Sequence, residues 1–181
     1  VLKQNDPSLI EASEELEVWN NENDPDTKDS VLESKIRSLS INVTQICNLR
    51  CTYCGANGDG TYGSDVKRIE LPKALQQVEH FLKDVKDGEA FRINFIGGEP
   101  LIYPEGVRAI AAFARQTLSD RSAKLTLEII TNATLITPEI TAMLAQIGAS
   151  VVVSFDGPPS LNDRARVTAS GRGSSEKVLD G

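Results

Sequence analysis

The chain has 181 residues, of which 40% are hydrophobic and 25% charged, enough for one α/β domain and a piece of another. Its net charge of −7 lies entirely in residues 1–36, which carry ten acidic and three basic side chains, whereas residues 37–181 are neutral. This distribution argues against a general nucleic-acid surface, and no stretch approaches the ~20 consecutive apolar residues of a membrane-spanning helix. We therefore predict an acidic N-terminal helix and linker over residues 1–36 and a core domain over residues 37–181 that continues beyond the last residue.

Residues 6–19 are predicted to form a short amphipathic helix. Asp6 followed by Pro7 is typical of a helix start, because proline lacks the N–H that the first turn leaves unbonded. Apolar residues then recur at helical spacing, at Leu9, Ala12, Leu16 and Trp19. Residues 20–30 are polar and rich in helix breakers, which predicts a linker. We expect the helix to dock on the core domain or on a partner.

From residue 37 onwards the hydrophobic pattern alternates between strands and helices. The predicted strands are residues 39–43, 91–96, 125–131 and 151–155. The predicted helices are residues 72–86, 104–118 and 138–147, and a further helix begins at 174–179. This order implies right-handed crossovers and a parallel sheet. Since four strands cannot close a barrel, the sequence predicts an α/β fold: a partial parallel (β/α) barrel, truncated after the fourth strand.

The only cysteines of the chain, Cys47, Cys51 and Cys54, lie within eight residues directly after the first predicted strand. Three thiolates at this spacing can hold three corners of an iron–sulfur cube and leave one iron without a protein ligand. An iron with an open position can bind a substrate or cofactor, so the spacing favours catalysis over electron storage.

Two other uses of the cysteines fit less well. A disulfide framework needs an even number of cysteines in a secreted chain, and residues 1–16 do not resemble a signal peptide. A structural zinc ion needs four ligands, and the only histidine, His80, is interpreted as an ordinary residue of a predicted helix. The thiols are interpreted as reduced, which predicts a cytoplasmic protein.

The other three predicted strands also end in unusual segments. The second is followed by Gly97-Gly98-Glu99-Pro100, in which the glycines allow close backbone approach to a ligand and Glu99 can accept a hydrogen bond from an ammonium group. Polar residues end the third and fourth strands: Thr131, Asn132, Ser154 and Asp156. Because the loops that follow parallel barrel strands meet at one face, we expect the four segments to converge.

The pattern C-x3-C-x2-C, with Tyr53 directly before the last cysteine, resembles the signature of radical S-adenosylmethionine enzymes. The resemblance implies two cofactors, a [4Fe–4S] cluster on the three cysteines and S-adenosylmethionine. In that family the aromatic residue packs near the adenine, and a GGEP segment like residues 97–100 binds the cofactor's amino group. For Asn132, Ser154 and Asp156, contact with the cofactor's ribose or backbone and simple capping of strand ends both remain open.

Residues 162–166 and 171–175 resemble a segment written H-D-x-x-R…G-x-G-[ST]-[FY] in peptide-modifying members of the family. The match implies that Arg166 forms a charge-assisted hydrogen bond to the cofactor's carboxylate, and an ion pair on the protein surface is the alternative. Asn162 stands where the family has histidine, a change that is compatible with cofactor binding. Ser175 stands where the family has an aromatic residue, and this change weakens the subfamily assignment. Residues 55–63, ending in Tyr62-Gly63, resemble a glycine- and alanine-rich segment of maturases that act on ribosomally made peptides.

The resemblance covers residues 38–179 and implies a SPASM-type peptide (RiPP) maturase, of which this chain would be the N-terminal fragment. Such an enzyme cleaves S-adenosylmethionine reductively to a 5′-deoxyadenosyl radical, abstracts hydrogen from a peptide, and forms a thioether or C–C crosslink. The implied partners are a precursor peptide and an electron donor such as flavodoxin or ferredoxin, with no nucleic acid and no membrane. No side chain is assigned as catalytic, because the difficult chemistry belongs to the cofactors.

Two alternatives remain open. One keeps the radical chemistry and changes the target, to a Ser or Cys oxidised by an anaerobic sulfatase-type formylglycine maturase or to a small metabolite. The other is a non-catalytic iron–sulfur or zinc binding module, which does not explain why residues 97–100 and Arg166 follow at the expected strand ends.

Overall fold

The computed structural model describes residues 36–61 and 67–181. The predicted helix at residues 6–19, the predicted linker at residues 20–30 and the Tyr62-Gly63 pair lie outside the described residues. Four strands form one sheet in the order β1-β2-β3-β4, and every neighbouring pair is parallel. The strands are β1 (Ser38–Asn42), β2 (Ala90–Ile96), β3 (Lys124–Thr131) and β4 (Ala149–Val153).

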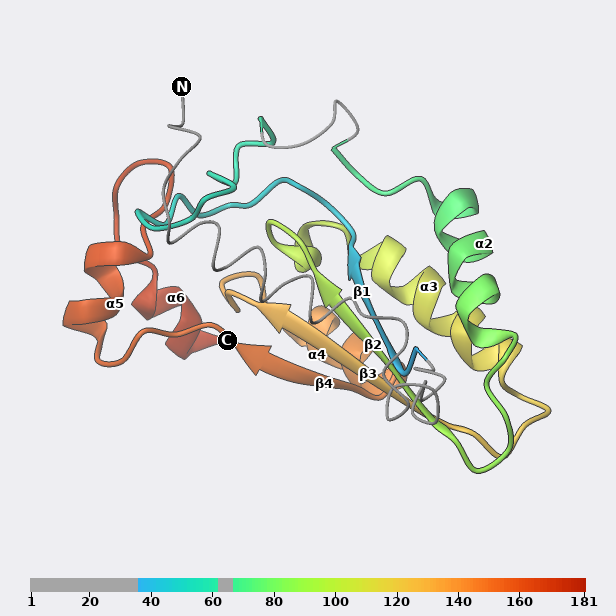
Figure 1. Cartoon of the computed structure of the whole chain (residues 1–181). Coiled ribbons are helices and arrows are strands. Elements are labelled where there is room, and N and C mark those ends of the chain that lie inside the picture. Colours follow the sequence, from blue (N-terminus) through green and yellow to red (C-terminus); the bar gives the residue numbers. More distant parts are fainter. Residues whose placement is uncertain (1–35, 62–66) are drawn as a thin grey trace, which may run out of the picture. The chain divides into compact units, whose positions relative to one another are not determined.

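Helices alternate with these strands (Figure 1). They are α2 (Leu71–Leu82), the 3-10 turn η1 (Pro100–Ile102), α3 (Pro104–Thr117), α4 (Pro138–Gln146), α5 (Pro159–Ala165) and α6 (Ser175–Asp180). The prediction of a partial parallel (β/α) barrel is therefore confirmed. Helix α5 was not predicted, because seven residues are too few to show a helical period, although proline in its first turn is a start signal shared with α2, α3 and α4.

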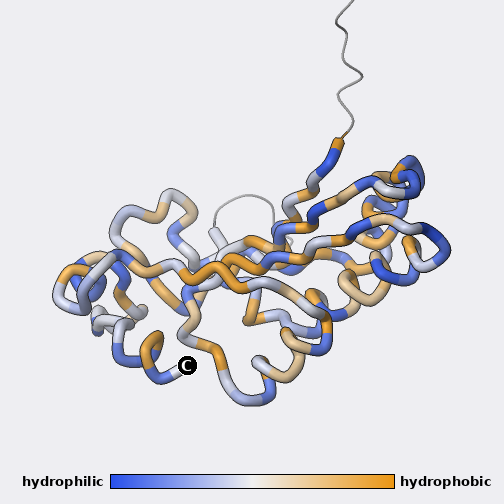
Figure 2. The backbone as a smooth tube through the Cα atoms, turned by 90° about the horizontal axis from the view of Figure 1, so that it is seen from below, coloured by the Kyte–Doolittle hydropathy of each residue, from blue (hydrophilic) through white to orange (hydrophobic). Residues whose placement is uncertain are grey.

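One face of the sheet carries the hydrophobic core. Phe91, Ile93 and Phe95 of β2 alternate with more polar neighbours and are almost fully buried, as are Leu127 and Ile129 of β3. Helices α2, α3 and α4 contribute further buried residues to this cluster. In Figure 2 the hydrophobic stretches of the tube gather along the strands in the middle of the domain. This packing fixes the carboxyl ends of the strands, where the predicted motifs lie.

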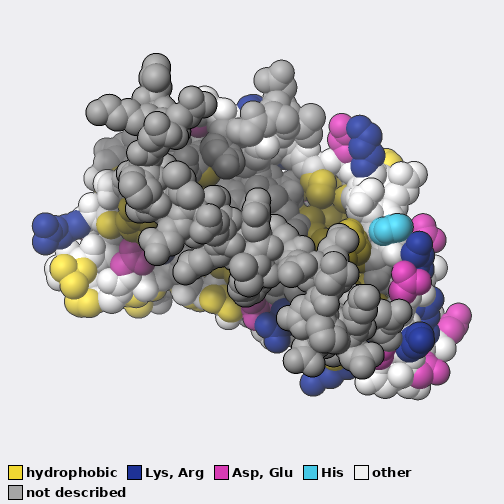
Figure 3. All heavy atoms as spheres, viewed as in Figure 1, with side chains coloured by type: hydrophobic (Ala, Val, Ile, Leu, Met, Phe, Trp, Pro, Cys, Tyr) yellow, Lys and Arg dark blue, Asp and Glu magenta, His cyan; other side chains and the backbone are white. Residues whose placement is uncertain are grey.

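The opposite face of the sheet has a different character. Neighbouring polar residues in register occupy it: Ser40, Asn94, Glu128 and Ser150. Nearer the carboxyl ends the same face becomes apolar with Ile96, Ile130 and Val152. On the outside, Figure 3 shows basic and acidic side chains interspersed over the side of α2. None of the helices in the described part of the chain has the length and hydrophobicity that a bilayer crossing requires.

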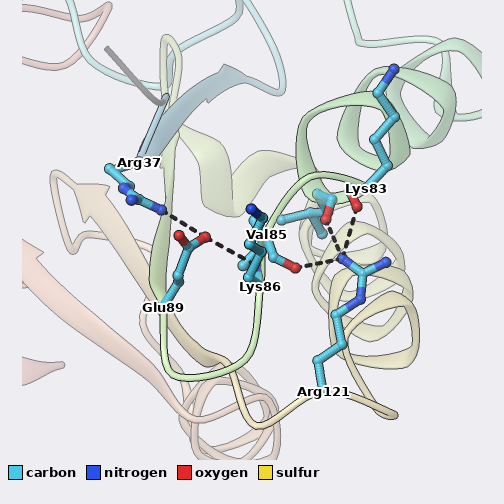
Figure 4. Close-up of polar contacts among 7 residues, drawn as sticks. Arg37, Lys83, Val85, Lys86, Glu89 and Arg121 are labelled. Carbon is cyan, nitrogen blue, oxygen red and sulfur yellow. Dashed lines mark hydrogen bonds and ion pairs between the residues drawn. The ribbon is translucent and has the colours of Figure 1, made fainter. Parts of the chain in front are cut away.

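Arg121 binds backbone carbonyl groups at the carboxyl end of α2. Its Nη1 donates to the backbone carbonyl oxygens of Leu82 at 2.7 Å, Lys83 at 3.1 Å and Val85 at 2.8 Å (Figure 4). The last carbonyl groups of a helix have no partner within the helix, and a positive charge there also interacts favourably with the helix dipole. Arg121 therefore ties the loop before β3 to the end of α2.

We expect Arg121→Ala to lower the free energy of unfolding by about 1–3 kcal/mol, the usual range for hydrogen bonds to a charged group. Urea denaturation followed by circular dichroism measures the change. Arg108→Ala is the matched control, because Arg108 is exposed on α3. Equal stability changes in the two variants would contradict the role given to Arg121.

Candidate functional site

A cavity of about 210 Å³ lies at the carboxyl ends of the strands and brings most of the predicted site residues together. Its lining includes Cys47, Cys51, Tyr53, Cys54, Gly97, Gly98, Glu99, Asn132, Ser154 and Arg166. Of the remaining predicted residues, Pro100 is buried at the start of η1, and Asp156 is bonded to two lining side chains. A larger cavity of about 410 Å³, between β1 and α2, is lined by none of these residues.

The loop that carries the cysteines is held by backbone groups. The N–H of Cys47 donates to Gly58 O at 2.7 Å. Arg50 Nη1 donates to the carbonyl oxygens of Cys47 at 2.7 Å, Leu49 at 2.8 Å and Gly58 at 3.1 Å. This role of Arg50 was not predicted, although its position between two cysteines was a possible signal. One guanidinium group thus joins both ends of the loop.

The arrangement of the cysteines distinguishes between metal groups. Among the described residues, no three His, Cys, Asp or Glu side chains are gathered closely enough to hold a single metal ion. A [4Fe–4S] cube has a different requirement, since each cysteine binds its own iron atom. Three thiols spread around one cavity therefore fit a cube better than a zinc ion. Burial raises the pKa of Cys47 and of Cys51, and for Cys51 the nearby Arg166 opposes this shift.

Gly58 is required by the shape of this loop. Its φ of +72° lies in the left-handed region, and a Cβ there would lie 2.8 Å from Cys47 Cβ and 2.9 Å from Leu49 O. We expect Gly58→Ala to distort the loop, because a non-glycine residue at positive φ costs about 1–3 kcal/mol before the clash is counted. The measurement is iron bound per chain after anaerobic reconstitution, which should fall well below wild type.

Gly55→Ala is the control for this experiment, because a Cβ at Gly55 meets nothing within 4 Å and its φ is not positive. It should retain the iron content of the wild type. If the Gly58 variant also retained it, the close packing around Gly58 would not be needed for the metal site.

The glycine pair after β2 lies against the chain that leads into the cysteine loop. A Cβ on Gly97 would lie 2.4 Å from Thr44 O, and one on Gly98 would lie 2.4 Å from Ile46 O. Backbone hydrogen bonds join the same segments, from Gly98 N to Thr44 O at 2.7 Å and from Glu99 N to Ile46 O at 2.9 Å. The glycines thus permit close approach of the protein backbone, and the expected approach of a ligand to them stays a prediction.

Glu99 is 1% exposed and its carboxylate is almost fully bonded. Oε1 accepts from Leu101 N at 3.0 Å and from Thr131 Oγ1 at 2.7 Å, and Oε2 accepts from Asn132 N at 2.8 Å. Burial raises the pKa of Glu99, and these three donors oppose the shift. Because a carboxylate offers about four acceptor positions, one remains free for a donor in the cavity.

Three side chains form a hydrogen-bonded ring next to Cys47. Asn132 Nδ2 donates to Asn48 Oδ1 at 3.0 Å, and Asn48 Nδ2 donates to Thr134 Oγ1 at 2.7 Å. Thr134 Oγ1 in turn donates to Asn132 Oδ1 at 2.6 Å. Asn132 was a predicted site residue, whereas Asn48 and Thr134 were not predicted. In addition, Asn132 Nδ2 lies 3.6 Å from Cys47 Sγ, within hydrogen-bonding distance for sulfur.

Tyr53, Asp156 and Arg166 contact one another on the other side of the cavity. The hydroxyl of Tyr53 donates to Asp156 Oδ2 at 2.6 Å, and Arg166 Nε lies 3.0 Å from Asp156 Oδ1 as an ion pair. The Arg166 guanidinium also lies over the Tyr53 ring, 5.5 Å from its centre. Burial, followed by the bond to Asp156, raises the pKa of Tyr53 to about 12. The Tyr53 bond and Arg166 hold the pKa of Asp156 below its usual value, so this carboxylate stays ionised at neutral pH.

Asn162, which stands where the family has histidine, supports this group from below. It is fully buried, and its Oδ1 accepts from Asp156 N at 3.3 Å while its Nδ2 donates to Ser174 Oγ at 3.2 Å. The loop that follows β1 also runs beside α5 (Figure 1), and Thr52 N donates to Ala165 O at 2.9 Å. The position of Arg166 therefore depends on both the cysteine loop and α5.

Residues 41–181 match the model of the Radical SAM superfamily. The chain is 30% identical over 146 residues to an uncharacterized protein of Methanocaldococcus jannaschii. This alignment covers 81% of the present chain and 47% of the relative. It is 28% identical over 157 residues to the radical SAM cyclopropyl synthase TigE of Paramaledivibacter caminithermalis, an alignment that covers 80% of the present chain and 32% of TigE. It is 29% identical over 150 residues to the probable GTP 3′,8-cyclase of Methanocella arvoryzae, an alignment that covers 81% of the present chain and 42% of the cyclase. The chain thus spans between a third and a half of the length of these relatives.

Two solved structures share the fold. The one described as "Native anSMEcpe with bound AdoMet" superposes with a TM-score of 0.69 at 25% identity, over 79% of this chain and 38% of that chain. The one described as "Native anSMEcpe with bound AdoMet and Cp18Cys peptide" has a TM-score of 0.67 at 26% identity, with the same coverage.

Proposed function

Since the chain belongs to the radical S-adenosylmethionine superfamily, whose members use a [4Fe–4S] cluster and S-adenosylmethionine, we propose that it is the part of a peptide-modifying enzyme that binds both cofactors. One observation carries the proposal: four strand ends far apart in sequence contribute to a single cavity. In it the three cysteines meet Glu99 and Arg166, a carboxylate and a guanidinium group suited to an amino acid's ammonium and carboxylate.

Each residue of the cavity has a proposed task. Cys47, Cys51 and Cys54 hold the cluster and leave one iron open for the cofactor. The free acceptor position of Glu99 accepts a hydrogen bond from the cofactor's ammonium group, for which Glu99 must be ionised. Arg166 binds the cofactor's carboxylate.

The remaining predicted residues surround the rest of the cofactor. Tyr53 packs near the adenine, and Ser154 and Asp156 contact the ribose. The backbone of Gly97 and Gly98 forms the cavity wall, and Pro100 begins the turn that buries Glu99. When bound, the cluster and S-adenosylmethionine supply the electron and the radical chemistry. The chain's own residues bind and orient the cofactor and exclude water.

In this proposal the substrate reaches the cavity along the face of the sheet opposite the hydrophobic core. Ile96 and Ile130 line the cavity on that face, and the polar row with Asn94 and Glu128 continues from them. A peptide is the substrate that we favour, because one structure of this fold, 26% identical to the chain, contains a bound peptide together with AdoMet. An electron donor such as flavodoxin or ferredoxin is the second proposed partner. The reduced thiols that the site needs favour a cytoplasmic location.

A small metabolite is the second candidate substrate. The relatives that support it include the probable GTP 3′,8-cyclase of Methanocella arvoryzae and an S-adenosylmethionine-dependent nucleotide dehydratase of Selenomonas ruminantium. A third candidate is a Ser or Cys side chain that the enzyme oxidises, as in a sulfatase-type maturase. Its substrate is a polypeptide, as in the peptide proposal.

Co-expression with a short peptide encoded beside the gene distinguishes these candidates. We expect mass spectrometry of the purified peptide to show a mass decrease that corresponds to lost hydrogen atoms. Fragment ions then distinguish a crosslink from an oxidised Ser or Cys. The same protein is incubated with GTP, S-adenosylmethionine and reductant as the parallel reaction. Consumption of GTP with an unchanged peptide would overturn the peptide proposal in favour of the metabolite.

A further inference from the structure

Hydrogen bonds to sulfur are unevenly distributed over the three cysteines. Cys47 Sγ accepts from the backbone N–H of Leu49 at 3.4 Å and from Asn132 Nδ2 at 3.6 Å. No residue in the described part of the chain donates a hydrogen bond to the sulfur of Cys51 or Cys54. Cys47 is therefore distinguished from its two neighbours by a side-chain N–H donor, Asn132, which directly follows β3.

The direction of the Asn132 amide follows from its neighbours. Its Oδ1 accepts from both the backbone N–H of Thr134 at 3.0 Å and the Thr134 hydroxyl at 2.6 Å, which occupy both acceptor positions. Nδ2 must then point the other way, with one hydrogen toward Asn48 Oδ1 and the other toward Cys47 Sγ. The opposite orientation of the amide would place Nδ2 against the backbone N–H of Thr134, so that two donors would face each other and that N–H would lose its acceptor.

The ring also holds Asn132 in place. Asn132 is 7% exposed, and its backbone N–H donates to Glu99 Oε2 at 2.8 Å. Asn48 contributes from within the cysteine loop itself, so the end of β3 and the loop are joined at the position of Cys47. With both ends of its amide engaged, Asn132 has no side-chain donor or acceptor left for the cofactor's ribose.

We propose that Asn132, oriented by Asn48 and Thr134, is a positioning residue that raises the reduction potential of the cluster through its N–H···S bond to Cys47. The inference rests on the proposed function, in which Cys47 is a cluster ligand. Reduction adds negative charge that is shared by the cluster and its thiolates, and an N–H donor stabilises that charge. Hydrogen bonds to the sulfurs are among the factors that set the potential of such clusters.

The test is a redox titration of the full-length protein, reconstituted with iron and sulfide and followed by electron paramagnetic resonance. The spectral change on addition of S-adenosylmethionine identifies the cluster with the open iron. Asn132→Leu removes the donor and is expected to shift the midpoint potential to a more negative value at unchanged iron content. Asn132→Asp keeps the acceptor for Thr134 and replaces the donor with carboxylate oxygen, so its negative shift should be larger.

Asn94→Leu is the matched control, because it makes the same change in an amide of β2 that donates to Ser40 Oγ at 3.3 Å. Its midpoint potential should equal that of the wild type. If Asn132→Leu prevents cluster assembly, the test relies on Asn132→Asp and Thr134→Val. Thr134→Val removes the two ring bonds of the Thr134 hydroxyl but keeps the backbone bond from Thr134 N to Asn132 Oδ1, so it should give a smaller shift in the same direction.

The outcomes separate this inference from the proposed function. A wild-type protein that forms no cluster on the three cysteines would overturn the proposed function first. A cluster that forms normally and has the same potential in the wild type and in the Asn132 variants would overturn only the inference about Asn132. A shift of equal size in Asn94→Leu would also overturn it, because the effect would then not depend on the bond to Cys47.

Discussion

Replacing Cys47, Cys51 and Cys54 together by alanine is expected to remove about four iron atoms per chain and to abolish cleavage of S-adenosylmethionine. The three thiols line one cavity, and no group of three His, Cys, Asp or Glu side chains in the described ranges offers another metal site. No alternative ligand is therefore at hand within the described part of this domain. The measurements are iron and sulfide per chain and the formation of 5′-deoxyadenosine in the reconstituted full-length protein.

Ser154→Ala is a suitable control for this triple variant, since Ser154 lines the same cavity without being a proposed cluster ligand. It should keep the iron content of the wild type even if it binds the cofactor less tightly. Undiminished iron in the triple variant would show that the cysteines do not hold the cluster.

Replacing Arg166 by alanine is expected to weaken the binding of S-adenosylmethionine by about 10- to 100-fold while leaving the cluster intact. A hydrogen bond to a charged group contributes roughly 1.5–3 kcal/mol, which corresponds to that range of affinity. In this structure Arg166 is paired with Asp156, and its side chain is only 15% exposed, so it is already held at the cavity wall. Calorimetric titration of the reconstituted protein measures the dissociation constant.

Arg164→Ala is the matched control, because Arg164 lies two residues away in the last turn of α5 and is exposed. Its dissociation constant should be that of the wild type. An unchanged constant in Arg166→Ala would reject the proposed role, and weaker binding in Arg164→Ala instead would transfer that role to Arg164.

The order of the elements and the place of the motifs were predictable from the sequence. Apolar strands that alternate with helices leave one parallel sheet as the reasonable solution, and the segments at their carboxyl ends must then meet. For this reason Gly97, Glu99 and Arg166 were expected in one place, and the cavity contains all three. The roles given to these residues remain predictions.

The supporting contacts were not predictable, because they depend on how loops close in three dimensions. Arg50 binds three backbone carbonyl groups, and no residue pattern in the sequence reports such a contact. Asn48 and Thr134 belong to different segments that meet only once β3 lies beside β2. Glu99 was expected to face the cofactor. In the structure its carboxylate also accepts hydrogen bonds from Leu101, Thr131 and Asn132, and these contacts depend on how η1 and the end of β3 pack.

The bonds that shape the cysteine loop have a consequence for how the enzyme matures. All of them join protein groups to protein groups: Arg50 to three carbonyl oxygens, Cys47 N to Gly58 O, and Asn48 to Thr134. The conformational entropy of the loop is therefore lost when the chain folds rather than when iron arrives. We expect the metal-free protein to resist limited proteolysis within residues 47–58 as well as the protein that holds its cluster does.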